Sequence, residues 1–189
     1  MTGDPAALPR IDSWGGPVIG AFTADSYDIG AGGQQILRLV PVDGHEAALG
    51  LALAAIDPWA RGGRSAGSLE AYWRRRDPTT FRFAILADGV LAGAVAVRDP
   101  FMRGPYLELL AVLPAFQSRG IGRAVMDWLA GEGLRAGGSN LWLCVSDWNA
   151  PARAFYEGLG FEAVGPIPDL AVTGTTEIFL RRRLAAPDA

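Results

Sequence analysis

A single glutamate interrupts an otherwise apolar run near the middle of the chain. Glu108 lies in the segment YLELLAV, whose other residues are typical of a buried strand. An isolated carboxylate there would be costly to desolvate unless it lined a wet cleft. Glu108 is therefore a candidate general base, and the alternative is a structural partner for an arginine. Because side chains alternate along a strand, we expect Tyr106, Glu108 and Leu110 to share one face.

The segment after this strand has the residue types of a phosphate site. Residues 112–123, VLPAFQSRGIGR, run from the strand through a tight turn into a helix. Successive N–H groups in such a turn, with the positive end of the helix dipole, can bind a pyrophosphate. Gly120 and Gly122 would leave room for it, and Arg119 could add donors. Taken alone, a glycine pair in this position is more often an ordinary strand-to-helix turn.

The composition excludes several other chemistries. All 17 basic residues are arginine, so there is no lysine for a Schiff base or a Walker A loop. One cysteine and one histidine cannot build an internal disulfide or a multi-histidine centre, and we predict no metal. A net charge of −3 does not indicate a nucleic-acid partner, and no stretch is apolar over the length of a membrane span. We predict a cytoplasmic protein.

The pattern of the chain predicts one mixed domain. Half of the 189 residues are apolar, which is enough for a single core. We expect a partly ordered N-terminal arm over 1–34, one domain over 35–184 and a tail over 185–189. The expected strands are 36–42, 81–89, 90–99, 106–114, 140–148, 161–165 and 176–184, and the expected helices are 45–56, 68–77, 123–138 and 149–160. Asp88-Gly89 predicts a hairpin, and Asn149 predicts a helix N-cap.

Two motifs together resemble those of the GCN5-related N-acetyltransferase (GNAT) superfamily. The first, Q/R-x-x-G-x-G/A, is matched by Gln117, Gly120 and Gly122. The second, N-x-x-[AS]-x-x-x-Y-x-x-x-G-F, lies one strand further on and is matched by the following residues: Asn149, Ala152, Tyr156, Gly160 and Phe161. The resemblance covers residues 36–184. It implies an α/β fold of the α+β mixed-sheet type: a single GNAT-like domain with a mostly antiparallel sheet and a splayed parallel pair, 106–113 and 141–147, flanked by helices.

The resemblance also implies acetyl-CoA as the co-substrate. Its pyrophosphate would lie on the amides of 117–123 and its pantetheine along 109–113, at the free edge that splayed strands leave. A main-chain N–H at a strand bulge would polarise the thioester carbonyl, with Leu110 or Ala111 in that place. The implied cofactor-binding residues are Leu110, Ala111, Val112, Gln117, Ser118, Arg119, Gly120, Ile121, Gly122, Arg123, Asn149, Ala152 and Tyr156.

Tyr156 receives its role from the same resemblance. From spacing alone it would be a core tyrosine on a helix face; the family's tyrosine protonates the departing CoA thiolate as a general acid. The predicted catalytic pair is therefore Tyr156 and Glu108, with Glu108 acting directly or through water. We interpret Cys144 as a small buried residue and not as a nucleophile, so no covalent intermediate is expected.

The predicted function is direct acetyl transfer to a primary amine of a small molecule or a protein in a ternary complex. We expect the acceptor pocket to be formed by residues 45–77, 99–105 and 165–176. Arg61 and Arg64 could clamp a substrate carboxylate or form solvated surface. The alternative function is a catalytically silent acyl-CoA-binding regulatory module. The resemblance further suggests a homodimer, since many relatives dimerise.

Overall fold

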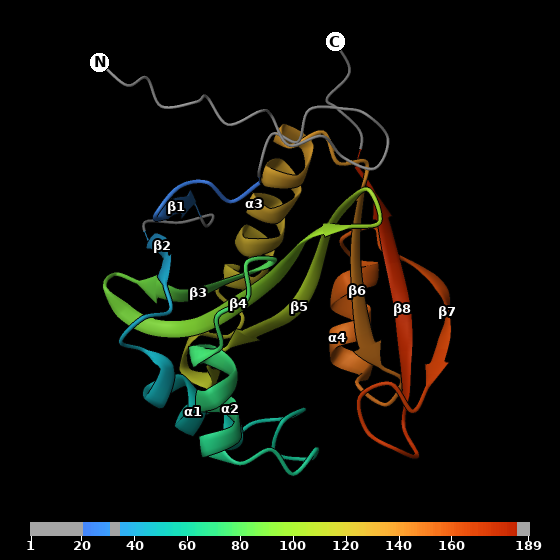
Figure 1. Ribbon diagram of the computed structural model, residues 1–189, viewed down its shortest axis with the longest axis horizontal. Coiled ribbons are helices and arrows are strands. Elements are labelled where there is room, and N and C mark those ends of the chain that lie inside the picture. Colours follow the sequence, from blue (N-terminus) through green and yellow to red (C-terminus); the bar gives the residue numbers. More distant parts are fainter. Residues whose placement is uncertain (1–20, 31–34, 185–189) are drawn as a thin grey trace, which may run out of the picture.

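The computed structural model describes residues 21–30 and 35–184 (Figure 1). The rest of the predicted N-terminal arm, 1–20 and 31–34, and the predicted tail, 185–189, lie outside the described residues.

Eight strands and four α-helices make up the described part of the chain. The strands are β1 (Tyr27–Gly30), β2 (Ile36–Pro41), β3 (Thr80–Ala87), β4 (Val90–Phe101), β5 (Gly104–Val112), β6 (Asn140–Ser146), β7 (Glu162–Pro168) and β8 (Thr176–Arg183). The helices are α1 (Glu46–Ala54), α2 (Ala66–Arg74), α3 (Ile121–Arg135) and α4 (Ala150–Glu157). All strands join one sheet in the order β1-β2-β3-β4-β5-β6-β8-β7. No helix in the described ranges has both the length and the apolar character needed to cross a membrane.

Helices cover both faces of this sheet (Figure 1). On one face, α3 and α4 bury an apolar stripe that includes Val125, Leu129 and Leu159. On the other face, α1 and α2 form a second core around Leu53 and Trp73, both almost fully buried. The helices thus pack against both faces of the sheet. This arrangement confirms the predicted mixed α/β architecture.

The parallel pair β5–β6 separates after a short contact, as predicted. Only Tyr106 with Trp142 and Leu107 with Leu143 are paired, and every other neighbouring pair of strands in the sheet is antiparallel. Beyond Leu107 the two strands diverge, and α4 lies close to the opening (Figure 1). The divergence leaves one edge of β5 without a strand partner and opens the sheet beside Glu108.

A β-bulge at Glu108 changes the predicted alternation of β5. Ala96 pairs with Leu109 and Val97 with Leu107, so Glu108 is an extra residue in β5. Leu109 consequently packs against the α1–α2 core, and Leu110 against the α3–α4 core. The prediction that Glu108 and Leu110 share one face is therefore wrong. The bulge itself also lies at Glu108 and not at Leu110 or Ala111.

Three local features differ from or refine the predicted elements. Residues 27–30, in the predicted arm, form β1 because Tyr27 and Ile29 pack against the core beside β2. Helix α2 begins earlier than expected: its N-cap is Ser65, whose Oγ accepts the N–H of Ser68 at 3.1 Å. The predicted turn at Asp88-Gly89 is confirmed, with φ of 50° and 80° at these two residues.

Candidate active site

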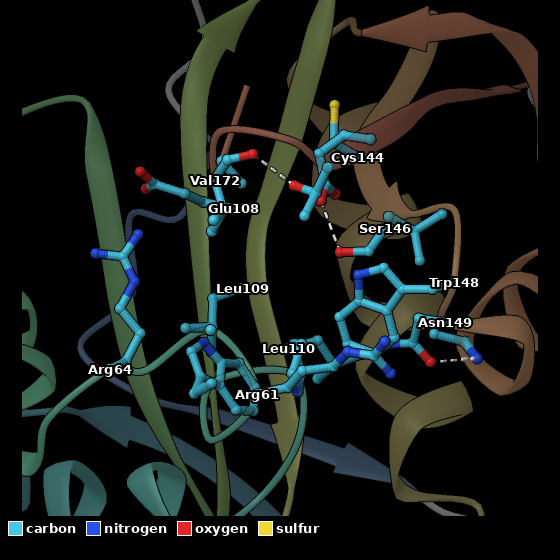
Figure 2. A pocket seen from close by; sticks show the side chains of 18 of the residues that line it. Arg61, Arg64, Glu108, Leu109, Leu110, Cys144, Ser146, Trp148, Asn149 and Val172 are labelled. Atoms are coloured by element: carbon cyan, nitrogen blue, oxygen red, sulfur yellow. Dashed lines mark hydrogen bonds between the residues drawn. The ribbon is translucent and has the colours of Figure 1, made fainter. Parts of the chain in front are cut away.

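A cavity of about 430 Å³ occupies the opening between β5 and β6 (Figure 2). Residues from the α1–α2 loop, Pro58 to Arg64, and from the β7–β8 loop, Ala171 to Thr175, complete its walls. Five predicted site residues line it: Glu108, Leu110, Asn149, Ala152 and Tyr156. This volume is in the range of small-molecule sites.

The side chain of Glu108 is held at the edge of this cavity. Arg98 Nη2 lies 3.4 Å from Glu108 Oε1, and the Glu108 side chain is 26% exposed. Its Oε2 is buried and receives no hydrogen bond from the described residues. Burial, with the nearby Glu108 charge as a smaller cause, raises the pKa of Tyr72 on α2. The glutamate is thus an arginine's partner, as one of the two sequence interpretations expected, and the residue contributes to the cavity lining while its second oxygen is enclosed by protein. Its role as a general base stays a prediction.

Tyr156 approaches the same cavity from α4. Its ring is packed edge-on against Phe155 and Phe161, with centroids 5.1 and 5.7 Å away. The residue is only 9% exposed, and this burial raises the pKa of its phenol above the usual value. A buried tyrosine with a raised pKa keeps its proton at neutral pH. The arrangement therefore supplies a protonated donor beside the cavity.

The start of α4 orients the tyrosine. Asn149 is the N-cap, as predicted, and its Oδ1 accepts the N–H of Ala152 at 3.3 Å. The helix ends near Gly160, whose φ of 82° reverses the chain into β7. These two residues of the second motif set the ends of a short helix, and Tyr156 projects from it toward the cavity.

The hydrogen-bonding pattern of β5 decides which amides face the opening. Leu113 N donates to Ala92 O on the β4 side at 2.8 Å. Because successive N–H groups along a strand point to opposite edges, the Ala111 N–H also faces β4, whereas those of Leu110 and Val112 face β6. Of the two predicted carbonyl-polarising positions, only Leu110 presents its N–H to the cavity side.

Residues 111 and 112 show the same alternation in their carbonyls. A Cβ on Gly93 of β4 would lie 2.1 Å from Ala111 O, so this carbonyl points at β4 and requires glycine there. The Val112 carbonyl lies on the open edge, where it accepts a hydrogen bond from Gln117 Nε2 at 3.0 Å. Neither residue lines the cavity, but Val112 belongs to its free strand edge.

The predicted pyrophosphate turn lies outside the cavity, at the far end of β5. Ser118 and Gly120 have φ of 61° and 79°, and Gly120 is the N-cap of α3 without any side-chain cap. The first N–H groups of this helix, from Ile121 to Arg123, therefore have neither an intrahelical acceptor nor a side-chain cap. Arg119 and Arg123 are exposed beside them. The turn therefore presents uncapped amides and two exposed arginines, which are groups that can bind an anion.

Gly122 has a packing role that the sequence did not predict. A Cβ there would come within 3.1 Å of the Phe155 ring, so the missing side chain lets α3 and α4 approach each other. Gly120, in contrast, has open space where its Cβ would be. Only Gly120 serves the turn conformation itself, because its positive φ is strained for other residues.

Sequence reasoning missed Glu177, which also lines the cavity. Glu177 on β8 is 7% exposed, and its Oε1 accepts the hydroxyl of Ser146 at 2.6 Å. Burial raises its pKa, with the Ser146 hydrogen bond opposing and the charge of Asp147 adding to the shift. The signal that could have found it is the one used for Glu108: a lone carboxylate in an apolar strand, here TEIFL.

Two side chains meet across the mouth of the cavity. The Arg61 guanidinium from the α1–α2 loop lies 4.4 Å from the ring centroid of Trp148, at the end of β6 (Figure 2). Arg64 also lines the cavity. The Arg61–Trp148 contact is a cation–π pair between loops far apart in sequence. For these two arginines the sequence allowed either a clamp for a substrate carboxylate or a solvated surface. Both of them belong to the cavity wall.

The predicted acceptor segments are only partly brought together. The connector within 45–77 and the loop within 165–176 line the cavity, but no residue of 99–105 does. Residues 101–104 form a tight turn between β4 and β5, where Phe101 pairs with Gly104. That turn is at the opposite end of β5 from the pyrophosphate turn. The prediction for 99–105 was therefore wrong, because these residues belong to the β4–β5 hairpin and do not reach the cavity.

Similarity to known proteins defines the class of this protein. The chain matches the Acetyltransferase (GNAT) family over residues 49–161. This segment includes β3 to α4 and therefore both motifs and most of the cavity. The protein belongs to the GNAT acetyltransferase family, and it is an acyltransferase.

Individual relatives agree with this assignment. The chain is 32% identical over 166 residues to streptothricin acetyltransferase of Streptomyces lavendulae, covering 86% of this chain and 79% of that protein. It is 38% identical over 79 residues to the ribosomal protein bS18 alanine N-acetyltransferase of Escherichia coli K12, covering 42% of this chain and 53% of that protein. The second match therefore spans about half of the relative.

A solved structure shares the fold. The aminoglycoside 6'-N-acetyltransferase complexed with coenzyme A superposes with a TM-score of 0.60 at 18% identity, covering 80% of this chain and 99% of that one. At this identity the likeness concerns the fold alone.

Proposed function

We propose that the protein transfers an acetyl group from acetyl-CoA directly to a primary amine, with both substrates bound together. The observation that carries this proposal is a single cavity that brings together Glu108, the Leu110 N–H edge and Tyr156. These groups supply a base, a carbonyl-polarising donor and an acid, which are the functions that aminolysis of a thioester requires.

The residues that would hold the co-substrate fit it. An uncapped helix N-terminus flanked by Arg119 and Arg123 suits a pyrophosphate, and the free edge of β5 offers hydrogen-bonding groups to an extended amide chain. Acetyl-CoA supplies the acetyl group as a thioester. The Leu110 N–H would donate to the acetyl oxygen as negative charge develops on it.

Proton transfers by Glu108 and Tyr156 balance the reaction. Glu108 takes a proton from the acceptor ammonium, directly or through water, which frees the nitrogen lone pair. The nitrogen then bonds to the acetyl carbon, and the bond from this carbon to sulfur breaks. Tyr156 donates its phenolic proton to the thiolate, and the second proton lost by the nitrogen restores the phenol. The products are an amide, a thiol and one released proton, and no step uses a metal.

The names of the relatives support an amine acceptor. They describe acetylation of streptothricin, of an alanine on a ribosomal protein and of an aminoglycoside. An amine nucleophile is therefore our proposal for this chain, either on a small molecule or on a protein N-terminus. The domain limits 35–184, a cytoplasmic location and a homodimer remain predictions alongside it.

The first experiment combines binding and turnover. We would titrate the purified protein with CoA and acetyl-CoA by thermal shift, and measure thiol release over a panel of amines. We expect CoA to raise the melting temperature, because it binds the folded state, and thiol release to require one amine class. Binding without thiol release from any amine would favour the silent acyl-CoA-binding module instead.

Direct transfer is tested separately from acetylation through Cys144, which lines the cavity. Burial raises the pKa of the Cys144 thiol, so the nucleophilic thiolate is disfavoured. We expect Cys144→Ala to keep its activity, initial-velocity lines to intersect, and the mass of the protein to stay unchanged with acetyl-CoA alone. An acetyl adduct that a later amine removes would contradict direct transfer.

A further inference from the structure

The acceptor side of the cavity contains a buried carboxylate that the transfer reaction does not use. We propose that Glu177 binds a second cationic group of the acceptor, so that the substrate carries at least two positive charges, one on the reacting amine and one at a fixed distance from it. This inference rests on the proposed function, since it specifies the acceptor of that same site.

Glu177 is fixed in place by the sheet. It is directly opposite Ser146 in the β6–β8 pairing, and the Ser146 hydroxyl donates to its Oε1. At 7% exposure the residue is buried, yet it lines the cavity. No hydrogen bond from the described residues reaches its Oε2. One oxygen is thus anchored to the protein, and the other remains available to a ligand in the cavity.

No cation within the described part of the chain neutralises this carboxylate. The seven ion pairs found there do not include Glu177. Two arginines line the same cavity: Arg61 stacks on Trp148, and Arg64 is in none of these ion pairs. A buried carboxylate without a cationic partner is unfavourable in the free protein. A ligand ammonium would supply the missing charge.

The separation of the two carboxylates favours an elongated dication. Glu108 is on β5 and Glu177 on β8, with β6 between them. Adjacent paired strands lie about 4.8 Å apart, so two strand steps give roughly 10 Å, and the splaying of β5 from β6 adds to it. The cavity lining also includes Trp59 and Trp148, and aromatic faces suit alkyl chains and cations. The cavity therefore fits an acceptor with charged groups at both ends.

The second charge can come from a free polyamine-like molecule or from a basic side chain near a peptide N-terminus, and the experiment separates these sources. The first arm measures thiol release with terminal diamines, from putrescine to octanediamine, each against the n-alkylamine of equal length. The second arm compares alanyl-lysine amide with alanyl-norleucine amide. The enzyme is the full chain in every arm.

We expect a preference of about 10- to 100-fold in kcat/KM for one diamine length or for the lysine peptide, the range expected for a charged hydrogen bond. Glu177→Gln, which keeps the size and the Ser146 contact, should abolish this preference by raising KM for the dication. The readout is the ratio of kcat/KM for the dication to kcat/KM for the monocation of equal length, and this ratio should fall to about one in the variant. Ser146→Ala should reduce the preference partly, and Glu162→Gln, at an exposed glutamate on β7, should not affect it.

A binding measurement keeps the inference separate from turnover. Calorimetric titration of the CoA-loaded protein with the same amines should show a tenfold or greater loss of diamine or peptide affinity in Glu177→Gln. If amines are acetylated but neither preference nor binding depends on Glu177, the inference is wrong and the proposed function stands. If Glu177-dependent binding occurs without thiol release, the inference stands and the proposed function is wrong. Absence of both overturns the two together.

Discussion

The two sides of the cavity are built in different ways. The cofactor side, as proposed above, consists of β5, the turn that follows it and α4, and its predicted binding residues occur in two short motifs. The proposed acceptor side is assembled from the α1–α2 loop, β6, β8 and the β7–β8 loop. Its contacts join residues distant in sequence, as in the Ser146–Glu177 hydrogen bond across 31 positions. A cofactor of constant shape can be bound by local turns, whereas an acceptor pocket depends on how separate elements meet.

The largest expected effect tests the cofactor side. Tyr156→Phe removes the phenolic proton but keeps the ring that packs against Phe155 and Phe161. We expect kcat to fall by about 10²- to 10⁴-fold, the usual contribution of a general acid. The measurement is thiol release at saturating amine. CoA binding, followed by thermal shift, should not change, and a variant that retains full activity would remove Tyr156 from the catalytic role.

A smaller effect is expected at the pyrophosphate turn. Gly120→Ala introduces a Cβ at a φ of 79°, at a cost of about 1–2 kcal/mol in folding stability. Distortion of the turn should also weaken CoA binding by about tenfold, which corresponds to about 1.4 kcal/mol. Calorimetric titration with CoA measures the affinity, and chemical denaturation measures the stability.

Gly89→Ala is the matched control for this change. Gly89 has a φ of 80°, and, like Gly120, has open space where its Cβ would be, but it belongs to the β3–β4 hairpin. We expect the same loss of stability with unchanged CoA affinity. If Gly120→Ala and Gly89→Ala bind CoA with equal affinity, the turn at Gly120 does not hold the pyrophosphate.

The smallest effect concerns the acceptor side and is a change of stability with pH. The folded-state pKa of Glu177 is raised, so its contribution to stability is fully present below the unfolded pKa, about 4.3, and is lost as the pH rises through the folded value. Glu177→Gln should therefore gain melting temperature relative to wild type as the pH rises from 4 toward neutrality. If the difference in melting temperature between Glu177→Gln and wild type stays constant over this pH range, burial of Glu177 carries no pH-dependent cost.

The cofactor side was largely accessible from the sequence. The Gly120 turn, the Asn149 cap and the position of Tyr156 follow from the spacing of residues within single strand–turn–helix units. The divergence of β5 from β6 was expected from the resemblance to the GNAT superfamily, and it is confirmed because only two residue pairs join these strands. Where the prediction was wrong on this side, the reason was one inserted residue: the bulge at Glu108 reverses the direction of every later side chain in β5.

The acceptor side was not accessible in this way. Glu177 carries the same sequence signal as Glu108, but nothing in the segment TEIFL indicates that β8 inserts between β6 and β7. That strand order places the glutamate opposite Ser146 and beside the cavity. The Arg61–Trp148 contact likewise depends on where two loops end.

The sequence by itself therefore determined the fold class, the family and the local geometry of the cofactor motifs. Hydrophobic periodicity, capping residues and turn glycines act over a few neighbouring positions, so short segments are enough to predict them. Only the tertiary structure decided that the N–H of Leu110, and not that of Ala111, points to the opening between β5 and β6. It also decided that Gly122 leaves space for the Phe155 ring and that Glu177 lines the cavity. These features depend on strand register, on a bulge and on the order of strands in the sheet. Each of them arises from packing between segments that are far apart in the chain.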